Sequence, residues 1–304
     1  MKLAVTGASV MSKLTGDKGE MPQFAANILT GESGIKVKMP SIPDKLETSK
    51  LKAFYPAIGE KHYRVGILAG CVMRVMFNAT NLATIRVLQQ NGCEVVVPES
   101  AGCCGALHLH SGFESDAKER AKALLLSLNS VEMDAFVVNS AGCGSTLKEY
   151  VEMFADDPGY SDIAAKLAGK VKDISEFLME IGMKAPTGTF SETVAYHDAC
   201  HLAHGQKITT QPRKLLSSIP GLKLVDLPES DTCCGSAGTY NLFQPEMAAR
   251  LQQRKIDFIE QTGATIVATG NPGCLAWIEQ GCKERGLPVR VMHPVDILDQ
   301  VYNN

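Results

Sequence analysis

Eight of the ten cysteines in this 304-residue chain form two sets of four that repeat in the same order. The first set is Cys71, Cys103, Cys104 and Cys143, and the second is Cys200, Cys233, Cys234 and Cys274. Matched members are 129, 130, 130 and 131 residues apart, and the sequence of 99–105 is similar to that of 229–235. Four matched cysteines at nearly constant separation indicate an internal duplication.

Thiols in sets of four can bind metals or inorganic clusters where the cell keeps them reduced. The amino-terminal residues make a poor signal peptide, because Thr6, Gly7 and Ser9 interrupt the apolar stretch. The most apolar later stretch, 65–77, contains Arg74 and is far shorter than the roughly 18 to 20 residues of a membrane span. We therefore expect a cytoplasmic protein whose thiols stay free for metal or redox chemistry.

Three chemistries can use such a set of thiols. Disulfides fit poorly, because adjacent cysteines such as Cys103 and Cys104 form strained bridges and the compartment is reducing. Structural zinc accepts four thiolates but usually takes them from closely spaced C-x-x-C-like pairs, which both sets lack. Iron–sulfur clusters need four cysteine ligands and tolerate irregular spacing. The pattern favours an iron–sulfur cluster in each half and leaves zinc as the alternative.

The elements that must position these thiols alternate between short aliphatic runs and longer amphipathic ones from Arg64 onward. In the first half this pattern predicts strands over 64–69, 93–97 and 134–139 and helices over 78–90, 114–128 and 145–153. In the second half it predicts strands over 193–197, 222–227 and 265–268 and helices over 245–261 and 273–285. Segments 171–178 and 291–298 also match, so the first half has about eleven extra residues, expected near 155–169.

Each cysteine of the two sets follows a predicted strand and precedes a predicted helix. The carboxyl ends of neighbouring parallel strands face one crevice, so loops at that edge can bring together sulfurs that are distant in sequence. Glycines beside the cysteines, such as Gly105 and Gly235, permit tight turns and close backbone approach to an inorganic core. The predicted fold is therefore α/β, with two duplicated parallel-sheet, Rossmann-like units related by a pseudo-two-fold axis.

The rest of the chain is predicted to support these two units. Residues 1–60 are expected to be a leader or linker, with at most one short helix near 21–29. The first unit is expected over 61–185 and the second over 186–304. The formal charge of −3, from 30 basic and 33 acidic residues, argues against a nucleic-acid partner, which would require a basic face.

Other residues near the cysteines have two interpretations each. Five histidines lie close to them in sequence: His108, His110, His197, His201 and His204. Their imidazoles can relay protons, bond to cluster sulfur or, for His201, replace a thiolate. Spacing alone identifies no ligand, however, and favours histidines that only pack or contact solvent. Cys93 and Cys282 have no counterpart in the other half and are expected to pack as small apolar side chains, Cys282 being the better candidate for a site role.

The absence of other motifs also favours one class of protein. The sequence contains no Ser/His/Asp constellation, paired acid or phosphate-binding loop, so we assign no catalytic residue and favour a carrier over a hydrolase or kinase.

The motifs C-x₃₁-C-C-G-x₃₇-C and C-x₃₂-C-C-G-x₃₈-C resemble the duplicated cysteine-rich CCG domain. This domain occurs in the cysteine-rich subunit of heterodisulfide reductase, in the lactate-utilisation iron–sulfur protein and in the iron–sulfur subunit of glycolate oxidase (glycolate dehydrogenase). The flanking sequences CCGSAGTY at 233–240 and NPGC at 271–274 are most similar to those of the last family. The resemblance covers about residues 62–302.

The resemblance implies an electron-transfer subunit of a 2-hydroxyacid dehydrogenase complex that lies at the inner membrane through its partners. An FAD-containing dehydrogenase subunit would oxidise glycolate or lactate, and this chain would pass the electrons toward quinone. The same resemblance leaves a second hypothesis, a catalytic subunit that reduces a disulfide at its cluster. A zinc-stabilised assembly module is the third.

The sequence departs from the family pattern in two places. No ferredoxin-like run of C-x-x-C motifs precedes Cys71, so we expect that part on a separate ferredoxin-like subunit or lost by truncation. Thr146 and Trp277 stand where heterodisulfide reductase has a further cysteine. Four ligands per half then imply one [4Fe–4S] cluster in each half, and Trp277 is expected to shield the second.

Overall fold

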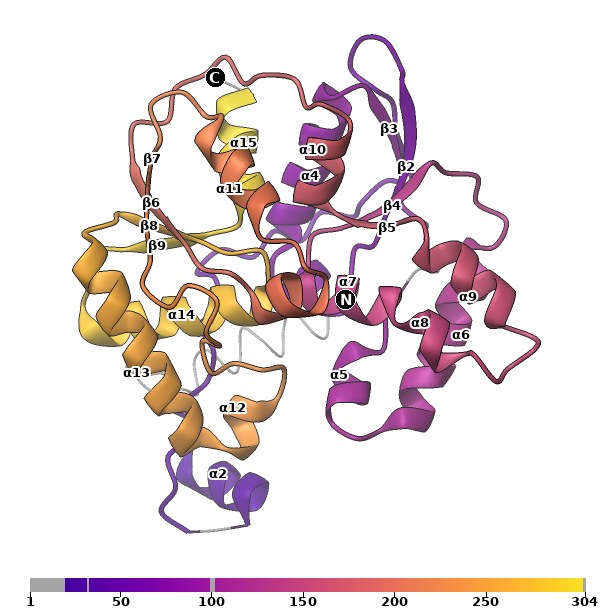
Figure 1. The fold of residues 1–304 in the computed structure, drawn as a ribbon. Coiled ribbons are helices and arrows are strands. Elements are labelled where there is room, and N and C mark those ends of the chain that lie inside the picture. Colours follow the sequence, from indigo (N-terminus) through magenta and orange to yellow (C-terminus); the bar gives the residue numbers. More distant parts are fainter. Residues whose placement is uncertain (1–19, 32, 99–101, 303–304) are drawn as a thin grey trace.

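The computed structural model describes residues 20–31, 33–98 and 102–302, and two sheets form its framework (Figure 1). The first sheet has the order β1-β3-β2-β4-β5, and the second has the order β7-β6-β8-β9. The strands are β1 (Phe54–Tyr55), β2 (Tyr63–Ile67), β3 (Cys93–Val96), β4 (Ala135–Val138), β5 (Val171–Asp173), β6 (Thr193–Tyr196), β7 (Lys223–Val225), β8 (Ile266–Ala268) and β9 (Arg290–Met292). Segment 99–101 of the predicted repeat and 1–19 of the predicted leader lie outside the described residues.

The two sheets have one topology. β1 runs antiparallel to β3, and every other neighbouring pair is parallel. With β1 set aside, each unit places its second strand at the edge, followed by its first, third and fourth strands. This identical order confirms the α/β class and the duplication predicted from the cysteines. In both units, the three strands that precede cysteines are therefore neighbours in the sheet.

The helices of the first unit connect these strands. They are α3 (Cys71–Met76), α4 (Asn78–Gln90), α5 (Ala106–His110), α6 (Glu114–Leu128), α7 (Ala141–Lys148), α8 (Tyr150–Met153), α9 (Ser161–Ala168) and α10 (Ile174–Glu180). α4 and α6 have the bounds that the apolar spacing predicts. α9 lies within the predicted insertion at 155–169 and has no counterpart between β8 and β9.

The helices of the second unit follow the same plan. They are the π-helical turn η1 (His201–Gly205), α11 (Thr210–Ser217), α12 (Tyr240–Phe243), α13 (Pro245–Thr262), α14 (Pro272–Arg285) and α15 (Pro294–Tyr302).

One predicted helix, 145–153, is wrong in its bounds. The structure has α7, which begins at Ala141, and a separate short helix α8. Small residues at the start of α7 look like a loop in sequence, but the helix there packs closely against the other unit. A side-chain carbon on Gly144 would lie 2.7 Å from Nε2 of Gln206. Glycine is therefore required by the close approach, although it lowers helix propensity.

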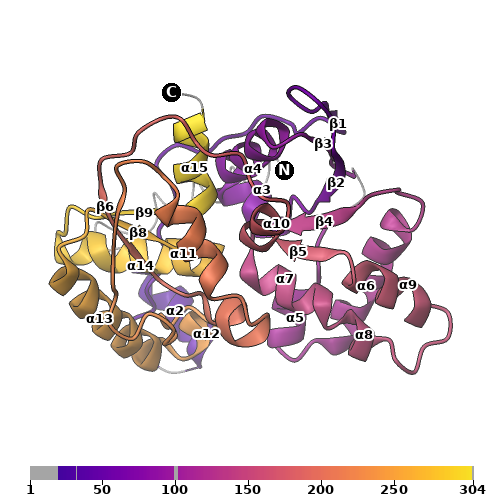
Figure 2. The same cartoon turned by 45° about the horizontal axis from the view of Figure 1, so that its top comes forward.

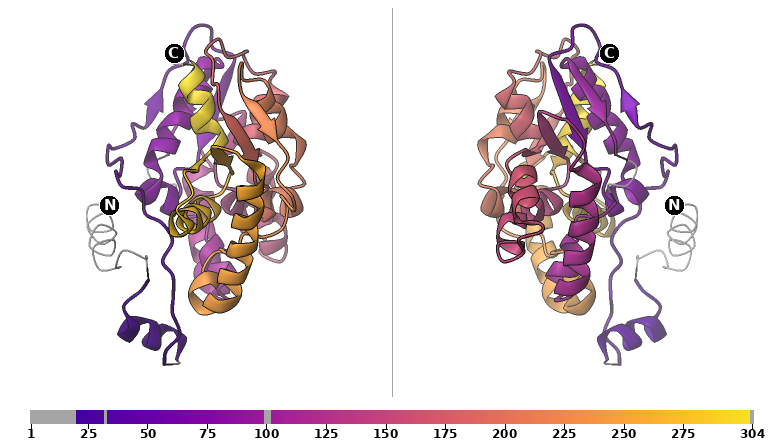
Figure 3. Two further views of the ribbon diagram at one scale, coloured as in Figure 1. Left: turned by 90° about the vertical axis from the view of Figure 1, so that its left-hand side faces the viewer. Right: turned by 90° about the vertical axis from the view of Figure 1, so that its right-hand side faces the viewer.

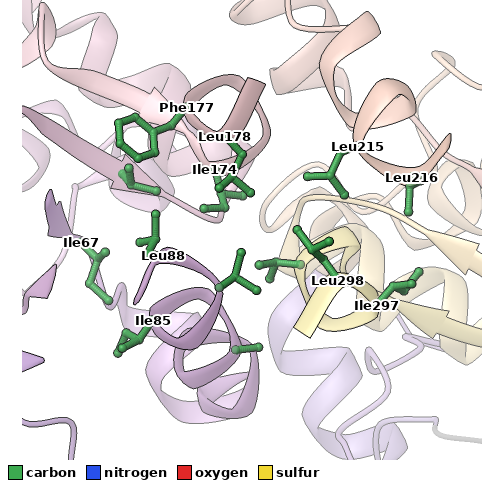
Figure 4. Packing of buried hydrophobic residues seen from close by; sticks show 14 of the residues in the cluster. Ile67, Ile85, Leu88, Ile174, Phe177, Leu178, Leu215, Leu216, Ile297 and Leu298 are labelled. Carbon is green, nitrogen blue, oxygen red and sulfur yellow. The ribbon is translucent and has the colours of Figure 1, made fainter. Parts of the chain in front are cut away.

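Three hydrophobic clusters pack on the faces of the two sheets, and the central one is shared (Figure 4). Alternate strand residues divide between the clusters, so Val194 and Tyr196 face the central one while Ala195 faces the outer cluster of the second unit. The same alternation is seen in β4. Side chains at alternate positions of a strand point to opposite faces. The central helices α4, α10, α11 and α15 consequently cover one face of both sheets.

The central helices meet in a reciprocal pattern (Figure 2). α4 packs against α15, and α11, the counterpart of α4, packs against α10, the counterpart of α15. Such exchanged contacts are what a two-fold relation produces. The α4–α15 contact also carries a bidentate ion pair, in which Arg86 donates to Asp299 over 2.6 and 2.9 Å. The two units are thus held in one fixed orientation.

The segment before the first unit runs over both units. The short helix α2 (Gln23–Thr30) contacts α12, at the lower end of the molecule in Figure 3. The Ser41 N–H then donates to the Ala276 carbonyl of the second unit over 3.1 Å, and β1 adds an edge strand to the first. None of the helices in the described ranges combines the length and the hydropathy that a bilayer crossing requires.

Replacing a side chain of the shared layer should weaken the fold markedly. Leu88 of α4 is fully buried in the central cluster, so Leu88→Ala should lower the free energy of unfolding by about 2–5 kcal/mol. Guanidinium titration measures this loss. The matched control is Leu126→Ala, because Leu126 on α6 is 58% exposed and its removal should change stability by about 0.5 kcal/mol or less. Equal losses for the two variants would contradict the role assigned to the central layer.

Candidate metal centres

The eight repeated cysteines lie at the carboxyl edges of the two sheets. Cys71 follows β2, the pair Cys103 and Cys104 follows β3, and Cys143 follows β4. Because β3, β2 and β4 are neighbours, the loops after them meet at one place. The second unit repeats this arrangement after β6, β7 and β8 with its own four cysteines: Cys200, Cys233, Cys234 and Cys274.

Three of the cysteines lie inside helices, as the predicted helix 273–285 already implied for Cys274 but not for the other two. Cys71 is the first residue of α3, while Cys143 and Cys274 are each the third residue of their helices, α7 and α14. The free N–H groups and the dipole at the start of a helix favour the thiolate form of a cysteine. This placement therefore suits Cys143 and Cys274 to binding a cation.

In the first set, the four sulfurs form one contiguous group. The Sγ atoms of Cys71 and Cys103 are 3.7 Å apart, and the thiol of Cys104 hydrogen-bonds with those of both Cys103 and Cys143. Cys104 is buried, whereas Cys71 is exposed. The protein therefore shields the group from solvent at Cys104, whereas solvent reaches it at Cys71.

The second set reproduces this order of contacts. The thiol of Cys233 hydrogen-bonds with those of Cys200 and Cys234, and the Sγ atoms of Cys234 and Cys274 are 3.5 Å apart. Cys234 and Cys274 are buried, while Cys200 and Cys233 are partly exposed. The structure therefore brings together all four predicted residues in each unit.

The glycine after each cysteine pair shapes the site. The Gly105 N–H donates to Sγ of Cys103 over 3.4 Å, and the Gly235 N–H donates to Sγ of Cys233 over 3.3 Å. Both glycines have positive φ, +81° and +96°, which L side chains rarely adopt. The C-C-G triplet thus supplies two thiols and a turn whose N–H group points at sulfur.

Contacts among the thiols separate their pKa values. Hydrogen bonds with the thiols of Cys104 and Cys71 lower the pKa of Cys103, and hydrogen bonds with Cys200 and Cys234 lower the pKa of Cys233. The same contacts, together with burial, raise the pKa values of Cys71 and Cys200. Hydrogen bonds with Cys104 and Cys234 likewise lower the pKa values of Cys143 and Cys274. Two thiolates per set are therefore stabilised by neighbouring thiols, which suits each set to binding a cation.

Both sets line a single cavity of about 240 Å³ between the units. All eight cysteines border it, along with apolar side chains that include Met73, Met76 and Leu107. His110 of the first unit and His201 of the second also border it, and their rings stack with centroids 4.8 Å apart. Burial and then the charge of His201 lower the pKa of His110. Two groups of soft donors thus face one mostly apolar space.

Asn271 links the two sites directly. Its Oδ1 accepts a hydrogen bond from the Gly142 N–H over 3.1 Å, next to Cys143 of the first set. Its Nδ2 donates to Sγ of Cys274 over 3.8 Å. The neighbouring backbone joins the units as well, because the Ala141 N–H donates to the Gly270 carbonyl over 3.0 Å. This connection was not predicted, since the pairing of residues across two units leaves no spacing signal.

The histidines occupy different places around the sites. His197 is fully buried, and one of its ring nitrogens lies within 4.8 Å of the sulfurs of Cys234 and Cys274. His204 instead contacts the Asp231 carbonyl, and His108 accepts from Arg120. Of the five histidines, then, His197 and the stacked pair His110 and His201 lie at the cavity or against the cysteines.

The other residues singled out in the sequence do not border the cavity. Cys93 and Cys282 are buried in hydrophobic clusters and do not border the cavity. Thr146 and Trp277 are fully buried, and Trp277 packs in the cluster that contains Cys234 and Cys274. Lys255 was missed, although a lysine in line with Gln252, Ile256 and Ile259 on the inner face of α13 is a sequence signal for a buried cation.

The donor chemistry fits a soft metal. Each site offers four sulfur donors and no carboxylate among the described residues that border the cavity. Thiolates select zinc, copper(I) and iron–sulfur clusters over hard cations such as Mg²⁺ and Ca²⁺. The residues present therefore fit an iron–sulfur cluster, with zinc also compatible in type.

Comparisons with known proteins agree with this assignment. The family model for the cysteine-rich domain CCG matches residues 65–148 and 194–279. The probable glycolate oxidase iron–sulfur subunit of Bacillus subtilis is 37% identical over 86% of this chain, which spans 60% of that protein's length. Lactate utilization protein A of Oceanobacillus iheyensis is 32% identical over 78% of this chain and 96% of its own. The Bacillus subtilis protein of the same name is 30% identical over 78% and 99%.

The site geometry predicts that replacing Gly105 lowers the free energy of unfolding substantially. A side-chain carbon on Gly105 would lie 2.8 Å from the Ala117 carbonyl oxygen, so Gly105→Ala should cost both backbone strain and overpacking, together about 2–5 kcal/mol. The control is Gly112→Ala, which has the same φ of +81° but no atom within 4 Å and should cost about 1 kcal/mol. Chemical denaturation measures both. If the two variants lose the same stability, crowding at the C-C-G turn is refuted.

Proposed function

The chain belongs to the cysteine-rich CCG domain family, and on this premise we propose that it is the electron-transfer subunit of a flavin-linked 2-hydroxyacid dehydrogenase. An FAD-containing partner subunit oxidises glycolate or lactate, and this chain passes the electrons one at a time toward quinone. The complex works in the cytoplasm, at the inner membrane through its partners.

The observation that carries this proposal is the presence of two contiguous groups of four sulfurs on one cavity. We assign one [4Fe–4S] cluster to each group. The ligands of the first are Cys71, Cys103, Cys104 and Cys143, and those of the second are Cys200, Cys233, Cys234 and Cys274. Such a cluster accepts and releases single electrons, which a flavin can supply after it has taken a hydride.

The chain's own residues would perform three tasks. The buried cysteines Cys104 and Cys234 hold each cluster against its unit's hydrophobic core. The N–H groups of Gly105 and Gly235 point at ligand sulfur, and such hydrogen bonds tune the potential of a cluster. Asn271 fixes one site relative to the other through its contacts with Gly142 and Cys274. These roles require a rigid pair of units, which the shared helix layer supports.

The alternative reactions of this family require groups that the sites lack. A fifth thiolate per half would be needed for the heterodisulfide reductase pattern, but Thr146 and Trp277 stand at those positions, and both are fully buried. We therefore favour electron transfer over disulfide reduction.

Metal analysis tests the proposal. Protein purified without oxygen should contain about four iron and four sulfide per unit and no stoichiometric zinc, because four thiolates are the full ligand set of one cubane. Cys103→Ser and Cys233→Ser should each remove one of two centres seen by electron paramagnetic resonance and leave the other. Cys93→Ser is the matched control and should keep both. Zinc without sulfide would overturn the proposal, and loss of both centres from one substitution would refute independent sites.

Partner dependence separates a carrier from a catalytic subunit. On its own, the reduced protein should not cleave a disulfide, because it offers no fifth thiolate. With the flavoprotein and a 2-hydroxyacid added, its clusters should become reduced, which is measured as bleaching of the visible absorption. Disulfide cleavage by the isolated chain with reduced viologen would contradict the carrier role. Glycolate and lactate, compared in the same assay, identify the substrate of the partner.

A further inference from the structure

One side chain behind the second site differs in kind from its counterpart in the first. The backbone N–H of His197 donates to the Ala268 carbonyl over 2.9 Å, and the backbone N–H of Leu68 donates to the Val137 carbonyl over 3.2 Å. These matching bonds put His197 and Leu68 at the same place, just after the first strand of each unit. Both side chains are buried. The second unit therefore has an imidazole where the first has a hydrocarbon.

The imidazole of His197 is placed to donate to ligand sulfur. Among the described residues, neither ring nitrogen has a partner with full hydrogen-bond geometry. The group nearest to serving as one is the sulfur of Cys274, since one ring nitrogen lies within 4.8 Å of the sulfurs of both Cys234 and Cys274. A buried polar group without a partner costs about 1–3 kcal/mol. Metal-bound thiolates are good acceptors, so a cluster in the second site would give this N–H its partner. Leu68 packs with Cys104 and offers no donor.

A second substitution points the same way. Gly105 and Gly235 are equivalent in the two units. A side-chain carbon on Gly105 would contact the carbonyl oxygen of Ala117 in α6, and one on Gly235 would contact that of Ala248 in α13. Ala117 and Ala248 are therefore equivalent positions of these two helices. Seven residues further on, Leu124 in α6 therefore matches Lys255 in α13. Lys255 is 2% exposed, and its Nζ donates to the Glu229 carbonyl. Burial lowers the pKa of Lys255, and the nearby Cys234, followed by the carboxylates of Glu229 and Asp231, opposes that shift. Leu124 packs in the cluster that contains Cys104.

The cation near the first site does not compensate for the imidazole and the amino group that are found beside the second site. The cation that acts on Cys103 is Arg120, which is exposed and donates to His108. An exposed charge is screened by water and salt, whereas a buried one acts through a low dielectric. The second site thus has both a buried N–H donor and a buried amino group, and the first has leucine at both positions.

We propose that the second unit holds the higher-potential centre of the two and that His197 sets this order by donating to its ligand sulfurs. This inference rests on the proposed function, since it requires a cluster in each unit. Donors to ligand sulfur and nearby positive charge stabilise the more negative, reduced cluster, which raises its potential. One electron then moves from the reduced first centre to the oxidised second centre, with no bond made or broken. An electron in the chain therefore resides preferentially in the second unit.

The test is a redox titration of the whole protein followed by electron paramagnetic resonance. Cys233→Ser and Cys103→Ser isolate the first and second centres, so each signal can be assigned. The second centre should be reduced at the higher potential. His197→Leu, which copies the first unit, should lower the reduced-to-oxidised ratio of the second centre at a fixed potential by roughly tenfold or more, equal to about 59 mV for one electron, and leave the first unchanged.

Two further variants keep the test decisive if His197→Leu folds poorly. Leu68→His should raise the potential of the first centre, because it adds the donor there. His197→Asn keeps an N–H group and should retain more of the wild-type potential than His197→Leu. A merely structural histidine would change stability without moving either potential.

Three results would overturn the inference: equal or reversed potentials in the wild type, no shift in any of the three variants, or loss of the second centre in His197→Leu and His197→Asn alike, which would make His197 a ligand. Each is distinct from failure of the proposed function, which would show as zinc or missing sulfide in the purified protein.

Discussion

The shared layer of α4, α10, α11 and α15 is the constraint on which the two sites depend. A parallel sheet must be covered on both faces, and here one layer of helices covers one face of each sheet. The units cannot separate without exposing the central cluster, in which Leu88, Leu178 and Leu298 are fully buried. Because the same helices touch both sheets, the carboxyl edges are fixed relative to one another, and the loops that follow the cysteine-bearing strands meet across one cavity.

Duplication explains the geometry of the sites, and local departures from it explain their chemistry. The order of sulfur contacts is the same in both sets, as are the glycine N–H bonds to Cys103 and Cys233. The residue before α7 is Ser140 and the residue before α14 is Asn271. Ser140 hydrogen-bonds with Cys143 of its own set, whereas the longer Asn271 contacts both Cys274 and Gly142. The side chain that links the sites therefore comes from the second unit.

Much of the fold could be predicted from sequence because the duplication supplied an internal alignment. The bounds of α4 and α6 followed from apolar spacing, and the eight cysteines from their constant separation. The start of α7 could not be predicted, since its Gly144 is required by the close approach of Gln206 from the other unit. Asn271 and the stacking of His110 on His201 depend equally on how the units face each other, which no pattern within one unit encodes.

A duplicated carrier has a physical reason to break its own symmetry. Two identical sites would have equal potentials, so an electron would occupy each half of the time and nothing within the chain would favour one site over the other. Changing a ligand would alter the cluster itself, and changing a surface residue would be screened by solvent. The positions left are buried ones close to the ligands but not bonded to metal. Leu68 against His197 and Leu124 against Lys255 are differences of this kind, placed by strand ends and a helix face that the duplication otherwise keeps alike.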